Sequence, residues 1–214
     1  MEERERSPLC ETPAEEMASS LTHAFGAAAS IFALILMVVR GEGALEITSC
    51  AIFGSTLVIL YLSSTIYHLV SGDRIKEFLQ LMDHSCIYLL IAGTYTPLTL
   101  LVLGGAWGWS LFGVVWGLAV AGIGFKAMTH GRNDHWISTA VYLAMGWLVV
   151  IALEPLLSAI EFNGFLILAA GGLFYTLGVV FFVLEKMRFN HAVWHLFVMG
   201  GSACHVIVVI RYML

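Results

Sequence analysis

Residues 47–69 read ITSCAIFGSTLVILYLSSTIYHL, a run of 23 residues that contains no Asp, Glu, Lys or Arg. A helix needs about 20 consecutive, mostly apolar residues to cross the hydrocarbon core of a bilayer. Uncharged runs inside soluble proteins are usually much shorter than this. The run therefore predicts a membrane-spanning helix, and it makes lipid the solvent that decides the fold.

Six further runs of similar character lie before and after this one, at residues 19–39, 82–103, 107–128, 136–153, 164–184 and 191–213. The 214 residues are 59% hydrophobic and 12% charged, whereas soluble domains carry about 25% charged residues. Seven spans and their short connections use nearly the whole chain. We therefore predict an all-α membrane protein, a bundle of seven transmembrane helices in a single domain.

The first residues differ from the rest of the chain. Residues 1–16 contain six Glu, Arg4 and Arg6, and no long apolar run. This composition predicts a flexible acidic leader over residues 1–16, followed by a transmembrane domain over residues 17–214. The chain has no clustered basic stripe, so we expect no nucleic acid partner. The sequence leaves the oligomeric state open.

Basic residues predict the orientation of the bundle, because connections on the cytoplasmic side of a membrane are enriched in Lys and Arg. With a cytoplasmic N-terminus, only Arg40 and Arg211 lie outside. The other eight then lie inside: Arg4, Arg6, Arg74, Lys76, Lys126, Arg132, Lys186 and Arg188. We predict a cytoplasmic N-terminus and an external C-terminus.

Two local features bear on helix packing. Pro97 lies within the third span, where it should kink the helix. Gly113, Gly117 and Ala121 follow one another at intervals of four residues in the fourth span, a spacing that lets two backbones approach closely. Packing within the monomer is the simpler interpretation of this stripe, and a dimer interface is the alternative.

Ionisable side chains gather at the predicted cytoplasmic ends of three spans. His68 ends the second span, Asp83 begins the third, and His191 and His195 begin the seventh. Residues four apart lie on the same face of a helix, so His191 and His195 can share a ligand, and Ser64 lies one turn deeper than His68. Charged and titratable groups are costly in a membrane and usually mark a functional site.

These residue types are typical of a zinc site. Three neutral histidines, His68, His191 and His195, would hold the ion and leave one coordination position open for water. Asp83 would accept a proton from that water. His205 lies ten residues beyond His195, about 15 Å along the helix. We expect it to be a hydrogen-bonded core histidine that takes no part in the site.

Three motifs resemble those of the haemolysin III proteins. They are Ser64-Thr-Ile-Tyr-His68, the segment from Asp83 through Gly93 to Pro97, and Asn190-His-Ala-Val-Trp-His195. This family is the bacterial branch of the progestin and adipoQ receptor family, which is itself similar to alkaline ceramidases. The likeness extends over the chain after the leader.

The resemblance implies seven helices, a multi-pass protein of the bacterial cytoplasmic membrane, and zinc on His68, His191 and His195. It further implies catalytic roles for Asp83 and Ser64, and supporting roles beside the ligands for Glu16 and His23. A structural role for His23 is the alternative. The family usually has Asn between that glutamate and that histidine, where this chain has Ser19, so the role of that position does not carry over.

Three functions fit these predictions. The first is a zinc-dependent hydrolase that cleaves an amide or ester bond of a membrane lipid and so affects lipid homeostasis. The second is a sensor or receptor of membrane state, in which zinc is structural and lipid is a ligand. The third is a cytolytic pore, suggested only by the family's name. No predicted helix has a polar stripe along its whole length, which argues against the pore.

Overall fold

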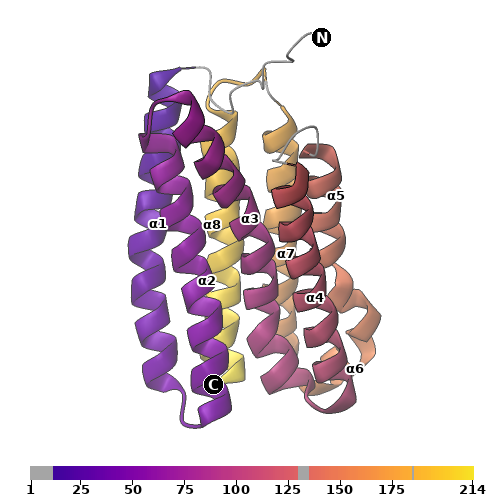
Figure 1. Ribbon diagram of the computed structural model, residues 1–214. Helices are drawn as coiled ribbons and strands as arrows, with labels where there is room; N and C mark the ends of the chain where they lie inside the picture. The colour runs from indigo at the N-terminus through magenta and orange to yellow at the C-terminus, as the bar shows by residue number, and fades with distance from the viewer. Residues whose placement is uncertain (1–11, 130–134, 185) are drawn as a thin grey trace.

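The computed structural model describes residues 12–129, 135–184 and 186–214. These residues contain helices and no strands (Figure 1). The helices are α1 (Pro13–Arg40), α2 (Ala44–Leu69), α3 (Asp73–Pro97), α4 (Gly105–Thr129), α5 (His135–Gly146), α6 (Leu153–Ala159), α7 (Phe162–Val183) and α8 (Asn190–Val208). Three short segments extend them: the π-helices η1 (Leu98–Leu103) and η3 (Val209–Met213), and the 3₁₀-helix η2 (Leu148–Ala152).

These elements form seven segments that are long and apolar enough to cross a membrane. Helix α3 continues into η1, α8 continues into η3, and α5, η2 and α6 together make the fifth span. The start of α1 and the end of the chain lie at opposite ends of the bundle (Figure 1). The predicted seven-helix fold is therefore confirmed.

The helices pack around one another largely in chain order. Helix α1 packs on α2, α2 on α3, and α3 on α4, and α8 closes the bundle by packing on both α7 and α1. Contacts of α5 with α4 and α7 are sparse by comparison. This side of the bundle is the less tightly packed one.

Polar and apolar side chains are distributed as a bilayer requires. Large apolar side chains are exposed along the outer surface, among them Val39, Val120 and Met128. Small hydroxyl side chains such as Ser30, Thr56 and Thr99 are buried between the helices. An apolar exterior of this extent is stable only against lipid. The chain is a multi-pass membrane protein.

Helix α1 begins within the predicted leader. Thr12 caps it: its hydroxyl accepts the Glu15 N–H at 3.3 Å, and the Glu15 carboxylate accepts the Thr12 N–H at 3.0 Å. Pro13 follows at the first helical position, which suits its fixed φ angle. Residues 13–16 are therefore helical, and the rest of the predicted leader, residues 1–11, lies outside the described residues.

The fifth span is longer than the predicted range of 136–153 and continues to Ala159. Pro155 falls in the first turn of α6, where a missing N–H removes no helical hydrogen bond. The break before η2 is bridged by Tyr95, whose hydroxyl donates to the Gly146 carbonyl and accepts the Val149 N–H, both at 2.9 Å. Helix α3 changes to the π-helix η1 directly after Pro97, the residue at which a kink is predicted.

The small-residue stripe of α4 does not pack within the monomer, and that prediction is wrong. Gly113, Gly117 and Ala121 are exposed. A Cβ atom added at Gly113 or Gly117 would meet nothing within 4 Å. The inner face of α4 is instead formed by Leu111, Val115 and Ala119, because side chains four residues apart recur on one face and leave the glycines on another.

Candidate metal centre

Three histidines from two helices meet at one end of the bundle. Each of His68, His191 and His195 offers one ring nitrogen, and these three atoms lie within 4.8 Å of one another. The ring centroids of His191 and His195 are 4.5 Å apart, and that of His68 lies 5.0 and 5.1 Å from them. All three side chains are buried. The cluster could hold a metal ion.

Glu16 fixes the ring of His68. The Nδ1 atom of His68 lies 2.6 Å from a carboxylate oxygen of Glu16. Because a carboxylate accepts and an N–H donates, Nδ1 carries the proton and Nε2 of the neutral ring keeps its lone pair for a ligand. Lys76 forms an ion pair with the other oxygen of Glu16. Carboxylate support of this kind is common at histidines that bind metals.

Backbone of α1 fixes the ring of His195 in the same way. Its Nδ1 atom donates to the Ser19 carbonyl at 3.1 Å and lies 3.2 Å from the Thr22 hydroxyl. A carbonyl can only accept, so Nε2 again keeps its lone pair. Position 19, where the family usually has Asn, thus contacts the cluster through its main chain, and that contact does not depend on the side chain.

His191 has a buried ring nitrogen that no described residue satisfies. Its Nε2 atom is buried without a hydrogen-bond partner among the residues described. A buried polar atom in this state costs roughly 1–3 kcal/mol. A metal ion bound by the cluster would remove that cost. This observation fits the three histidines to a metal.

The chain is held in a strained conformation just before His191. Phe189 has a φ of 58°, in the left-handed region that side chains other than glycine rarely adopt. Its N–H donates to a carboxylate oxygen of Glu15 at 3.0 Å. Glu15 therefore links α1 to the start of α8 by a hydrogen bond. This bond fixes the position of the first turn of α8, which carries His191. Sequence reasoning missed this role, although Thr12 and Glu15 have the spacing of a capping box.

His23 supports the cluster from α1. Its ring stacks on His195 with centroids 3.4 Å apart and an angle of 9°, and its edge meets Tyr61 at 4.8 Å. Both of its ring nitrogens are buried and lack hydrogen bonds within the described part of the chain. It contributes no atom to the three-histidine group. His23 packs against one face of the His195 ring.

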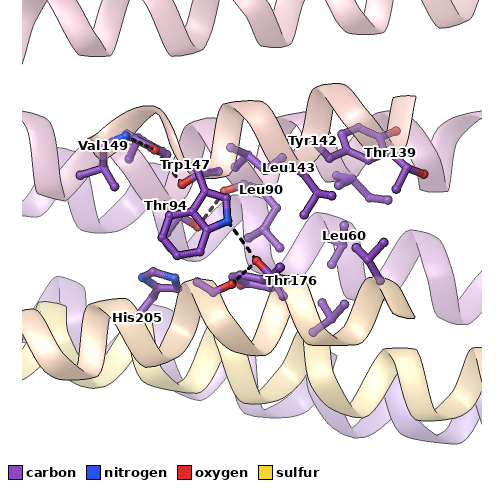
Figure 2. A pocket seen from close by; sticks show the side chains of 18 of the residues that line it. Leu60, Leu90, Thr94, Thr139, Tyr142, Leu143, Trp147, Val149, Thr176 and His205 are labelled. Carbon is purple, nitrogen blue, oxygen red and sulfur yellow. Dashed lines mark hydrogen bonds between the residues drawn. The ribbon is translucent and has the colours of Figure 1, made fainter. Parts of the chain in front are cut away.

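A cavity of about 350 Å³ extends from the cluster into the bundle. At the cluster it is lined by His23, His191 and His195, together with the predicted catalytic residues Ser64 and Asp83. Both of these are buried, and the Ser64 side chain is a neighbour of the Asp83 carboxyl. Farther in, the lining is mainly apolar, with Leu60, Leu143 and Val149 among its residues (Figure 2).

Lys126 is a second charged group on this cavity. Lys126 is one of the basic residues predicted to lie on the cytoplasmic side. Its side chain is 1% exposed and lines the cavity together with Asp83. Neither Lys126 nor Lys76 was predicted to belong to the site. Each is a single cation close to a helix end, and such residues usually lie in the membrane interface. The sequence pattern gives no signal that turns them inward.

Comparison with known proteins gives one consistent result. A family model described as haemolysin-III related matches residues 12–206. Hemolysin-3 of Bacillus cereus is 42% identical over 203 residues, which cover 94% of this chain and 92% of that protein. The hemolysin-3 homolog of Bacillus subtilis (strain 168) is 43% identical over 201 residues, covering 92% and 94%. The human monocyte to macrophage differentiation factor is 29% identical over 205 residues, covering 93% and 84%.

Proposed function

This chain belongs to the haemolysin-III-related family, and we propose that it is a zinc-dependent hydrolase that cleaves an amide or ester bond of a membrane lipid. One observation carries the proposal. A single cavity joins His191 and His195 of the three-histidine cluster, and the buried carboxyl of Asp83, to an apolar space inside the bundle. A lipid has the matching two-part chemistry, with a polar bond to cleave and an apolar chain to bury.

The histidine donor set suits zinc. Imidazole nitrogens are its common ligands, and three protein ligands with one open position are typical of catalytic zinc sites. The hydrogen bonds from His68 to Glu16 and from His195 to Ser19 put the proton of each ring on Nδ1, so that each Nε2 atom carries the lone pair that a metal needs. When bound, zinc supplies Lewis acidity, lowering the pKa of a coordinated water to about 7 and polarising a carbonyl group.

The protein's own residues supply the proton chemistry. Asp83 accepts a proton as water attacks the carbonyl carbon of the lipid, and it returns the proton to the leaving amine or alcohol. Ser64, one turn deeper than the His68 ligand, donates a hydrogen bond to the carbonyl oxygen as negative charge develops there. The apolar lining beyond them buries the acyl chain and keeps bulk water away from the reacting bond.

The same proposal sets the protein in the bacterial cytoplasmic membrane, with the metal centre at the cytoplasmic leaflet and membrane lipid as its substrate. The Bacillus relatives are bacterial. Eight of the ten Lys and Arg residues favour this orientation.

Zinc content and lipid turnover, measured on the same variants, test the proposal. The purified wild type should hold about one zinc per chain and release fatty acid from a ceramide or a diacyl phospholipid. His191→Ala and His195→Ala should lose zinc and turnover together. Asp83→Asn should keep zinc and lose at least about 100-fold in turnover, the scale of general base catalysis.

His205→Phe is the matched control, because it removes another histidine of α8 that does not belong to the cluster. It should keep zinc. A wild type that binds no zinc in chelator-free buffer would contradict the proposal at its centre. Zinc without turnover of either probe, and no lipid that accumulates on gene deletion and falls on re-expression, would contradict the hydrolase.

A receptor or sensor with structural zinc is the second candidate, and one observation favours it. Helices α2 and α8 share few direct contacts, so a metal on His68, His191 and His195 would pin them together. For this function Asp83→Asn should retain both zinc and the cellular phenotype. Loss of the phenotype with zinc retained supports the hydrolase instead.

A further inference from the structure

His205 lines the same cavity, away from the candidate metal centre. It is ten residues after His195 on α8, which is about 15 Å along the helix axis. It lines the cavity together with Trp147, Thr94 and Thr176 (Figure 2). This wall is otherwise mainly apolar. A titratable ring at this depth of a membrane protein calls for a functional explanation.

The imidazole has no hydrogen-bond partner in the described part of the chain, which corrects the sequence-based expectation of a satisfied core histidine. The ring stacks on the Tyr175 ring, with centroids 5.7 Å apart and an angle of 14° between the planes. A polar group at this depth of a membrane is costly unless a molecule in the cavity supplies the hydrogen bond.

The polar groups around His205 are already engaged with one another. The Trp147 indole N–H donates to the Thr176 hydroxyl at 3.0 Å, and that hydroxyl donates to the Gly172 carbonyl at 2.8 Å. The Thr94 hydroxyl donates to the Leu90 carbonyl at 2.8 Å. These groups already use their donor hydrogens, whereas neither ring nitrogen of His205 has a hydrogen-bond partner among the described residues.

The packing holds the ring in place at the cavity. A Cβ atom at Gly171 of α7 would lie 2.8 Å from the Nε2 atom of His205. A side chain larger than glycine at that position would press on the ring, which also stacks on Tyr175. These two neighbours hold the ring on the cavity wall.

We propose that His205 recognises a hydroxyl group on the lipid chain that occupies the cavity. The inference rests on the proposed function, from which it takes the presence of a lipid chain in this space. A hydroxyl both donates and accepts, so it pairs with a neutral imidazole in either tautomer. The distance of about 15 Å from His195 puts the recognised group far along the chain from the bond at the metal centre.

Binding of two matched fatty acids tests this inference without any turnover. The probes are dodecanoic acid and ω-hydroxydodecanoic acid, titrated into the purified protein by calorimetry. The wild type should bind the hydroxylated acid roughly ten-fold more tightly, the factor that one net hydrogen bond supplies. His205→Phe retains an aromatic ring for the Tyr175 stack and should abolish the preference. His205→Gln retains a hydrogen-bonding group and should keep part of it.

Leu168→Met is the matched control, a change of similar volume in the apolar lining. It should leave the ratio of the two affinities unchanged. Equal affinities for the two acids in the wild type would overturn the inference, as would a preference that persists in His205→Phe. If His205→Phe does not fold, the same comparison is made with His205→Gln, in which an undiminished preference overturns it.

The two proposals fail in different ways. A ten-fold preference for the hydroxylated acid that depends on His205, in a protein that cleaves no lipid, would support this inference and contradict the proposed hydrolase function. Zinc-dependent cleavage without any difference between the affinities for plain and hydroxylated chains would contradict this inference and leave the hydrolase proposal intact.

Discussion

At the scale of single residues, hydrogen bonds set the protonated nitrogen of two of the three rings in the candidate metal centre. Glu16 and the Ser19 carbonyl hold the Nδ1 protons of His68 and His195, and stacking on His23 fixes the plane of His195. These contacts orient the ligands before any metal binds. Most of them come from α1, which contributes no ligand of its own.

Removal of Glu16 should therefore weaken metal binding without removing a ligand. We expect Glu16→Ala to lower the affinity for zinc by about 10- to 100-fold, the usual effect of losing a partner that supports a metal-bound histidine. Competition with a chromogenic zinc chelator measures this. Glu46→Ala is the control, because Glu46 caps α2 at the other end of the helix. Equal affinities in Glu16→Ala and the wild type would show that His68 needs no support.

At the scale of helices, close packing depends on which face each glycine occupies. Gly93 of α3 lies against Thr56 of α2, and a Cβ there would collide with the Thr56 hydroxyl and come within 2.8 Å of its methyl group. The Thr56 hydroxyl donates to the Phe53 carbonyl at 2.8 Å, so the side chain is not free to turn away. Gly117 of α4 faces open space. The two glycines have the same chemistry and opposite surroundings.

Alanine at these two positions should have opposite effects. Gly93→Ala overpacks the contact between α2 and α3 and should destabilise the protein by about 1–3 kcal/mol. Gly117→Ala meets no neighbour and should be neutral or slightly stabilising, because alanine is the better helix former. Thermal unfolding in detergent measures both. A Gly117→Ala protein that melts lower than Gly93→Ala would contradict this account of the packing.

At the scale of the whole molecule, the candidate metal centre lies at one end of the bundle. The C-terminal end of α2 and the starts of α1, α3 and α8 lie at this end (Figure 1). The opposite end carries the connection between α1 and α2 and the end of the chain. Which end faces the cytoplasm is a prediction from the distribution of basic residues.

Cysteine accessibility in intact cells tests that orientation. In a variant without the four natural cysteines, Gly43→Cys lies in the connection between α1 and α2, and Ser71→Cys lies between α2 and α3. With a cytoplasmic N-terminus, a membrane-impermeant maleimide should label position 43 in intact cells and position 71 only after lysis. The reverse pattern would invert the topology and move the metal centre to the outer leaflet.

Much of the architecture follows from the sequence alone. Hydropathy predicts seven spans, because a bilayer sets a minimum length for an apolar run and tolerates few charges within it. The chain order of those spans then brings His68, His191 and His195 to one end of the bundle, and the i, i+4 spacing puts two of them on one face. The structure confirms that the three rings meet. The zinc, the catalytic roles of Asp83 and Ser64 and the orientation stay predictions.

The rotation of each helix about its own axis was decided only by the tertiary structure. Lipid and protein interior are about equally apolar, so a membrane helix shows little sequence contrast between its outer and inner faces. That is why Gly113 and Gly117 of α4 turned out to face outward, and why Lys126 and the unsatisfied ring of His205 turned out to face the cavity. Hydropathy determines which residues enter the membrane, and the packing of neighbouring helices determines what each of them faces there.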